Sequence, residues 1–214
     1  MSSIHITLSF LSLFIFIFQK LFAAPTIHLC RPEQRDALLE FKNEFKIRKP
    51  YFDECYINGV SPYPKTVSWT RNSDCCYWDG IKCDAKSGEV IELDLSCSCL
   101  HGWIHSNTSL FRLQNIRFLG LSRNDLYGQI PSSVENFSHL TSLDLSSNHF
   151  TGQIPSSIGN LFHLTSLNLF DNMFTGHIPS TVGNLSHLTS LYLPANQFSG
   201  HIPTSIGKLS HLTS

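Results

Sequence analysis

Four histidines at a fixed interval are the first residues whose type and spacing suggest chemistry. They are His139, His163, His187 and His211, each 24 residues after the one before. Imidazole nitrogens bind transition metals and change charge near neutral pH, so a stacked row could hold a metal or act as a pH switch. However, the Leu-Thr-Ser that follows each histidine recurs as well, and tandem duplication copies any residue at a fixed interval. This favours a surface row over a metal site.

The cysteines are a second group with metal-binding chemistry, because all seven lie in the first half of the chain. Cys76, Cys83, Cys97 and Cys99 could supply four thiolates to zinc, but their spacing matches no common zinc finger. Clustered cysteines in a secreted chain are typical of disulfides instead. They predict a disulfide-bonded segment over residues 25–89 and no metal site.

The odd number of cysteines leaves at least one of them outside the intramolecular disulfides. The sequence does not assign the partners of Cys55, Cys97 and Cys99. A disulfide from the last two positions back to the cysteine-rich segment is one open arrangement.

Catalytic motifs are absent from the sequence. It has no Gly-x-Ser-x-Gly elbow, no phosphate-binding glycine loop and no His-Glu-x-x-His pattern. Asp144 and Asp171 are 27 residues apart, three more than one repeat, so they make a poor acid–base pair. The formal net charge of -1 gives no electrostatic case for nucleic acid. We predict a protein that is not an enzyme, with no cofactor and no nucleic-acid partner.

The four histidines and the two aspartates lie within a 24-residue block that repeats through the second half of the chain. Full copies begin at Ile116, Leu140, Leu164 and Leu188, and a fifth copy begins at Leu212. A degenerate unit with a 26-residue period begins at Val90. Units of this length bury their apolar faces only by stacking on their neighbours. Residues 90–214 therefore predict an α/β solenoid.

Each block contains one predicted strand. The segment Ser142-Leu-Asp-Leu-Ser146 alternates polar and apolar residues, which predicts a strand with Leu143 and Leu145 inside and Ser142, Asp144 and Ser146 outside. Successive strands would form a parallel sheet on the concave side of the solenoid. Leu140, Phe150, Ile154, Ile158 and Leu161 would fill the rest of the interior.

One asparagine recurs after each predicted strand. Its amide can both donate and accept hydrogen bonds, which suits a turning backbone. We expect an internal structural ladder rather than a row of ligand-binding residues. Its members are Asn124, Asn148, Asn172 and Asn196.

Comparison of the copies separates constant positions from four variable outward positions. Phe170 and Tyr192 are the strongest recognition candidates, because aromatic anchors dominate binding energies and the rest of this face is small and polar. Neutral drift is the alternative explanation. The predicted ligand-binding residues of the concave face are Asp144, Asn168, Phe170, Asp171, Tyr192, His149 and Met173.

The N-terminal segment predicts secretion. Leu8–Phe18 is apolar but too short to span a bilayer, and Ala23 and Ala24 suit signal-peptidase cleavage. We interpret residues 1–24 as a signal peptide, with an uncleaved anchor as the alternative. The N-glycosylation sequons at Asn107, Asn136 and Asn184 agree with this route.

The cysteine-rich segment predicts a cap for the exposed end of the solenoid. Pro32 suits the first turn of a helix, and Leu38, Phe41 and Phe45 share one apolar stripe. Trp69 and Trp78 are predicted core residues of this cap.

These motifs resemble a known family. The segments EQRDALLEFK from residue 33 and CCYWDGIKC from residue 75 resemble the N-terminal cap of plant extracellular leucine-rich repeat proteins. The block L-x-x-L-x-L-x-x-N-x-[LF]-x-G-x-I-P resembles their plant-specific repeat, and the nearest likeness is to plant receptor-like proteins. The resemblance implies a right-handed superhelix, an extra sheet at Gly152–Pro155, and the disulfides Cys30 with Cys75 and Cys76 with Cys83.

The resemblance also implies a function. We expect an extracellular ligand-recognition module, in defence or developmental signalling, for a peptide, glycan or protein ligand, with a co-receptor kinase as a further partner. The protein would lie on the extracellular side of the plasma membrane if the chain continues past Ser214 into an anchor, and in the apoplast otherwise. A secreted inhibitor of polygalacturonases and a truncated, non-functional receptor fragment are the alternatives.

Overall fold

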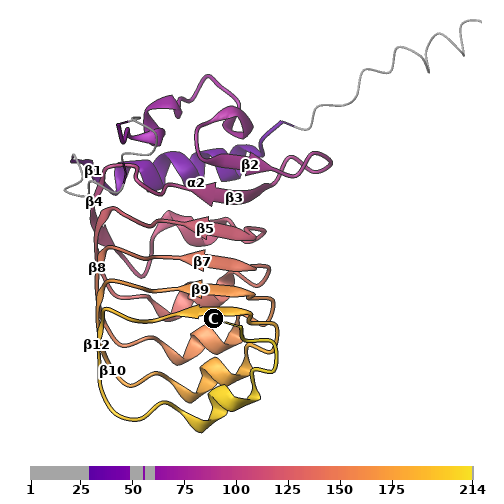
Figure 1. The fold of residues 1–214 in the computed structure, drawn as a ribbon. Coiled ribbons are helices and arrows are strands. Elements are labelled where there is room, and N and C mark those ends of the chain that lie inside the picture. The colour runs from indigo at the N-terminus through magenta and orange to yellow at the C-terminus, as the bar shows by residue number, and fades with distance from the viewer. Residues whose placement is uncertain (1–28, 49–54, 56–60, 214) are drawn as a thin grey trace, which may run out of the picture.

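The computed structural model describes residues 29–48, 55 and 61–213, so the predicted signal peptide lies outside the described residues (Figure 1). One α-helix, α2 (Pro32–Asn43), covers the end of the solenoid. It begins with proline in its first turn, where the missing N–H costs no hydrogen bond. Leu38 and Phe41 are fully buried and Phe45 nearly so, as the apolar stripe predicted.

Three disulfides hold the cap together and join it to the repeats. Cys30–Cys75 and Cys76–Cys83 are the two pairs that the resemblance implied. The third, Cys55–Cys97, resolves the open assignment and links the cap to the first coil. Cys99 is buried and belongs to none of these disulfides. The buried rings of Trp69 and Trp78 stack with centroids 5.5 Å apart.

The first sheet has the order β11-β9-β7-β5-β3-β2. Its β2–β3 pair is antiparallel and all other pairs are parallel. The strands stay in register across coils, so Leu119, Leu143 and Leu167 face one another inside. The strand bounds are β2 Ile81–Cys83, β3 Val90–Asp94, β5 Phe118–Gly120, β7 Ser142–Asp144, β9 Ser166–Asn168 and β11 Ser190–Tyr192.

A second sheet has the order β1-β4-β6-β8-β10-β12, with only β1–β4 antiparallel. The extra sheet predicted at Gly152–Pro155 lies earlier in the repeat, because its strand ends at Gly152. Gly152 has φ +76° and Pro155 has no N–H to donate, so strand pairing does not continue. The bounds are β1 Lys46–Ile47, β4 Leu100–Ile104, β6 Asp125–Gly128, β8 His149–Gly152, β10 Met173–Gly176 and β12 Gln197–Phe198.

Short 3-10 helices complete each coil. Those of the four 24-residue repeats follow directly after a proline. Successive helices pack closely at Gly159, where an added Cβ would collide with the Thr181 backbone and side chain. The bounds are η2 Lys65–Ser68, η3 Cys75–Tyr77, η4 Ser109–Arg112, η5 Ser132–Asn136, η6 Ser156–Asn160, η7 Ser180–Asn184 and η8 Thr204–Lys208.

One hydrophobic core runs from the cap through the coils. Phe150, Phe174 and Phe198 stack one above the other, with ring centroids 6.1 and 6.2 Å apart. Each buried side chain of this size contributes about 1.5–3 kcal/mol, which a coil gains only when its neighbours cover it. The predicted interior residues are all buried: Leu140, Phe150, Ile154, Ile158 and Leu161.

The recurring asparagines lie inside the turn between the two sheets. The Asn148 Nδ2 donates to the carbonyl oxygens of Leu121, Leu145 and Ser146, and its Oδ1 accepts from the Leu126 N–H. Its amide therefore satisfies backbone groups of two coils at once, which is the structural role predicted for the ladder. Among the described residues, no helix is both long and apolar enough to cross a membrane.

Candidate ligand-binding surfaces

The first sheet presents polar side chains at the ends of β7 and β9. The Asp144 Oδ1 accepts hydrogen bonds from the Ser146 N–H and hydroxyl, at 3.0 and 2.7 Å. The Asn168 Oδ1 accepts from the Phe170 N–H at 3.1 Å. Both side chains hold the turn and remain half-buried, so their other edge faces solvent. Ser146 lies on the same side as Asp144, as predicted, but it is buried, and its hydroxyl is turned to that carboxylate.

Phe170 and Tyr192 are exposed aromatic residues from neighbouring coils. Each residue is 43% exposed. Tyr192 pairs with Asn168 in the first sheet, and Phe170 follows Asn168 by two residues. Asp171 comes next and is exposed, in a left-handed conformation with φ +56°. The structure therefore places Phe170, Asp171 and Tyr192 together at the C-terminal ends of β9 and β11.

His149 and Met173 do not belong to this face. Strand pairing places them at the starts of β8 and β10 in the second sheet. The chain turns between the two sheets at residues with positive φ, Ser147 and Asp171. Side chains after this turn no longer share a surface with the strand before it.

His149 instead joins a charged cluster that sequence reasoning missed. The largely buried carboxylate of Asp125 lies 2.7 Å from His101 Nδ1, 3.1 Å from His149 Nδ1 and 3.5 Å from an Arg48 Nη atom. The Tyr127 ring stacks on His149 with centroids 5.0 Å apart. A signal was present in the sequence, because the two histidines flank Asp125 at intervals of 24 residues.

The cluster controls the pKa of Asp125. Burial by itself raises the pKa of this carboxyl. Hydrogen bonds from Tyr127 and His101, and positive charge on His101 and His149, outweigh burial and lower the pKa below its ordinary value. A lowered pKa in the folded state stabilises the fold above the unfolded-state value of about 3.9, and this contribution is lost as the pH falls through the folded-state pKa.

Replacing Asp125 with asparagine should therefore lower the Tm at pH 6 and lower it less at pH 3, where the carboxyl of the unfolded chain is protonated and part of this contribution is lost. Thermal unfolding followed by circular dichroism at both pH values measures the difference. The exposed Asp171→Asn is the matched control and should change the Tm little at either pH. An equal effect of Asp125→Asn at pH 6 and pH 3 would contradict this role.

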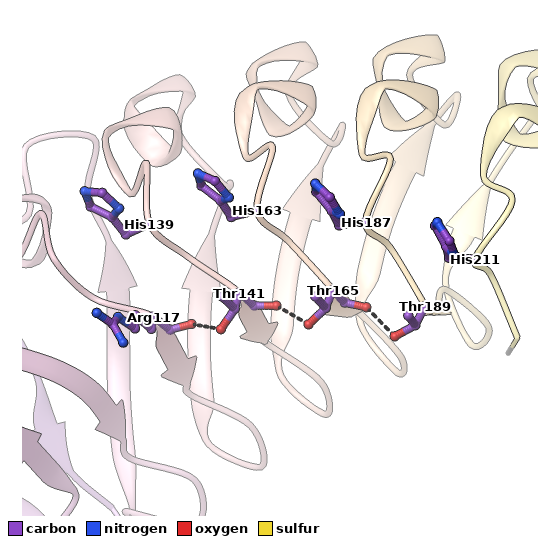
Figure 2. A pocket seen from close by; sticks show the side chains of 8 residues that line it. All are labelled: Arg117, His139, Thr141, His163, Thr165, His187, Thr189 and His211. Carbon is purple, nitrogen blue, oxygen red and sulfur yellow. Dashed lines mark hydrogen bonds between the residues drawn. The ribbon is translucent and has the colours of Figure 1, made fainter.

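A groove of about 590 Å³ runs along one flank of the solenoid, and we call it the histidine groove (Figure 2). It follows the segments that connect the 3-10 helices to the strands of the first sheet. The imidazoles of His139 and His163 are stacked, with centroids 6.4 Å apart and planes 11° apart. The lining residues are Arg117, Thr141, Thr165 and Thr189, with His139, His163, His187 and His211.

The threonines form the floor of this groove. The hydroxyl of Thr141 donates to the Arg117 carbonyl oxygen, that of Thr165 to the Thr141 oxygen, and that of Thr189 to the Thr165 oxygen, at 2.8–2.9 Å. The N–H of each of these threonines donates to the same oxygen. Figure 2 shows the four imidazoles in a row beside this ladder.

The geometry supports neither a metal site in the histidine row nor a zinc site at the cysteines. Among the described residues, only Cys30, Asp74, Cys75 and Cys76 bring three or more ligand atoms close together, and three of these are disulfide-bonded. Three of the four cysteines considered for zinc also form disulfides. The sequon residues Asn107, Asn136 and Asn184 are all exposed, and their glycosylation stays a prediction.

A disulfide-bonded cap on a two-sheet solenoid of mostly parallel strands defines a capped repeat protein. Two families match the chain: the leucine-rich repeat region over residues 90–214 and the leucine-rich repeat N-terminal domain over residues 31–84. The chain belongs to the leucine-rich repeat family, with the features of the plant extracellular receptor-like proteins.

Known proteins of Arabidopsis thaliana are similar to this chain in sequence or in structure. Receptor-like protein 35 is 67% identical over 136 residues, which are 62% of this chain and 14% of that protein. The chain thus spans about one seventh of that relative's length. The BIR3–SERK2 complex matches at 32% identity and TM-score 0.64, over 80% of this chain and 86% of the other. The receptor kinase HAESA with its IDA peptide hormone matches at 30% identity and TM-score 0.59, over 83% and 31%.

Proposed function

We propose that this chain is the extracellular ligand-recognition module of a plant receptor-like protein. The protein is secreted through its N-terminal segment and recognises a peptide or protein with the first sheet. The exposed pair Phe170 and Tyr192 carries this proposal, because large aromatic side chains on a rigid polar face are typical binding anchors. The likeness to HAESA bound to a peptide hormone supports a peptide as the ligand.

The rigidity of the face supports the same function. Asp144 and Asn168 hold the turns beside the aromatic pair with their side-chain oxygens. A surface fixed by such bonds loses little conformational freedom when a ligand binds. The likeness to the BIR3–SERK2 complex supports a second partner, a co-receptor kinase, for the assembled receptor. Both the defence or developmental role and the plasma-membrane location belong to this proposal.

Selection of a random peptide display library on the purified chain tests the face. We expect enriched peptides to bind the wild-type chain and to bind the Phe170→Ala/Tyr192→Ala variant at least about 30-fold more weakly, since anchors of this kind contribute about 2 kcal/mol or more. Isothermal calorimetry with the enriched peptides measures this loss.

Phe162→Ala is the matched control, because Phe162 is an exposed phenylalanine, 55% accessible, outside the first sheet. It should leave the affinity unchanged. A library that yields no specific peptide, or peptides that bind the double variant as tightly as the wild type, would show that this face is not the recognition surface.

A further inference from the structure

The histidine groove has a charge pattern that the proposed function does not use. Among its lining residues, Arg117 alone carries a permanent charge, and none is acidic. The adjacent 3-10 helices carry Glu135 on η5 and Lys208 on η8, neither of which lines the groove. The Glu135 carboxylate accepts a hydrogen bond from the Asn160 side chain at 2.6 Å. The strands that follow the groove begin with serines, and the Asp144 carboxylate at the end of β7 is hydrogen-bonded to Ser146. Arg117 interacts electrostatically with the Asp84 carboxylate, so the charge of the groove beyond Arg117 depends on its histidines.

The charge of the groove depends on pH. Histidine side chains gain a proton between about pH 8 and pH 5, and each proton here adds a positive charge to that of Arg117. The His139 and His163 rings are 6.4 Å apart, which is less than the Debye length of about 8 Å at physiological ionic strength. Charges on neighbouring rings therefore act together, and a row of anions along the groove would relieve their mutual repulsion.

The spacing of the first two imidazoles matches one kind of ligand. An extended peptide rises about 3.2–3.4 Å per residue, so side chains at alternate positions recur every 6.4–6.8 Å on one face. This is close to the 6.4 Å between the first two imidazoles. The threonine hydroxyls donate their protons to backbone carbonyls, so their oxygens can still accept hydrogen bonds from the N–H groups of such a peptide.

We propose that the histidine groove binds an extended acidic peptide segment, with Asp or Glu at alternate positions, when its histidines are protonated. This site lies on the flank of the solenoid, is separate from the aromatic pair of the first sheet, and does not depend on that pair. Binding would strengthen as the surrounding medium becomes more acidic and weaken as salt is added.

A labelled peptide of four Asp-Ser units is the probe, with fluorescence anisotropy at pH 5.0 and pH 7.5 as the measurement. We expect at least tenfold tighter binding at pH 5.0. The His163→Asn/His187→Asn variant should lose most of this gain, and His201→Asn, an exposed histidine outside the groove, should keep it. Phe170→Ala/Tyr192→Ala should bind the probe like the wild type, which separates this site from the proposed recognition face.

Three results would overturn the proposal. The first is an affinity that is equal at the two pH values or unaffected by His163→Asn/His187→Asn. The second is equal binding of a peptide in which four Asp residues precede four Ser residues, because the alternate spacing would then carry no information. The third is pH-dependent binding of an oligouronate to the groove with no binding of the Asp-Ser peptide, which would assign the groove to an acidic glycan.

Discussion

Asn124→Ala is expected to destabilise the protein by about 3–5 kcal/mol. The Asn124 side chain is fully buried, and its Oδ1 accepts from the N–H groups of Ser98 and Leu100 at 3.1 and 2.9 Å. Its Nδ2 donates to three carbonyl oxygens, of Leu95, Leu121 and Ser122. Each buried group left without a partner costs about 1–3 kcal/mol, and the two N–H groups lose their acceptor together. A loss of this size is a large part of the stability of a typical domain.

Urea unfolding at 25 °C, followed by circular dichroism, measures this loss. Asn160→Ala is the matched control, because Asn160 is exposed on η6 and its Nδ2 bonds only the carboxylate of Glu135. It should cost less than about 1 kcal/mol, as exposed polar contacts usually do. If Asn124→Ala cost no more than Asn160→Ala, the ladder would not hold the coils together.

Gly159→Ala is expected to destabilise the protein by about 1–3 kcal/mol, because an added methyl group overpacks the contact between η6 and η7. The new Cβ would collide with the backbone and side chain of Thr181. One coil earlier, Glu135 occupies the corresponding position. The contact between η5 and η6 therefore accommodates a side chain, whereas the contact between η6 and η7 has no room for one.

The chain contains its own control for this prediction. Gly207 occupies the same position two coils later, and a Cβ there would meet nothing within 4 Å. Gly207→Ala should be neutral, or stabilising by up to about 1 kcal/mol through the lower entropy of the unfolded chain. Equal changes in the urea midpoint for Gly159→Ala and Gly207→Ala would show that the contact between η6 and η7 accepts a methyl group without loss of stability.

The period of the sequence predicted the repeating core correctly, and local geometry explains where the prediction failed. Leu143 and Leu145 are buried because alternation holds along the strand. Beyond it, Ser147 adopts φ +50°, which turns the backbone and ends the alternation. His149 follows this turn, so it lies in the second sheet and was wrongly predicted to belong to the face of the first.

Other features depend on contacts that a single sequence does not specify. The Cys55–Cys97 disulfide joins residues 42 positions apart, and no local pattern selects this pair over one with Cys99. The Asp125 cluster likewise depends on three coils that come together in the second sheet. Aromatic exposure at Phe170 and Tyr192 was the part of the candidate site that alternation along the strand could predict.

The position of the disulfides gives the molecule two mechanical regimes. All three close loops between Cys30 and Cys97, whereas the coils from Ile116 onward are held by contacts with their neighbours. Under a pulling force, the coils can detach one at a time, and each releases 24 residues, or about 80 Å of extended chain. The cross-linked cap cannot lengthen in this way. A chain built on this plan would yield along its repeats while its N-terminal end keeps its shape under load.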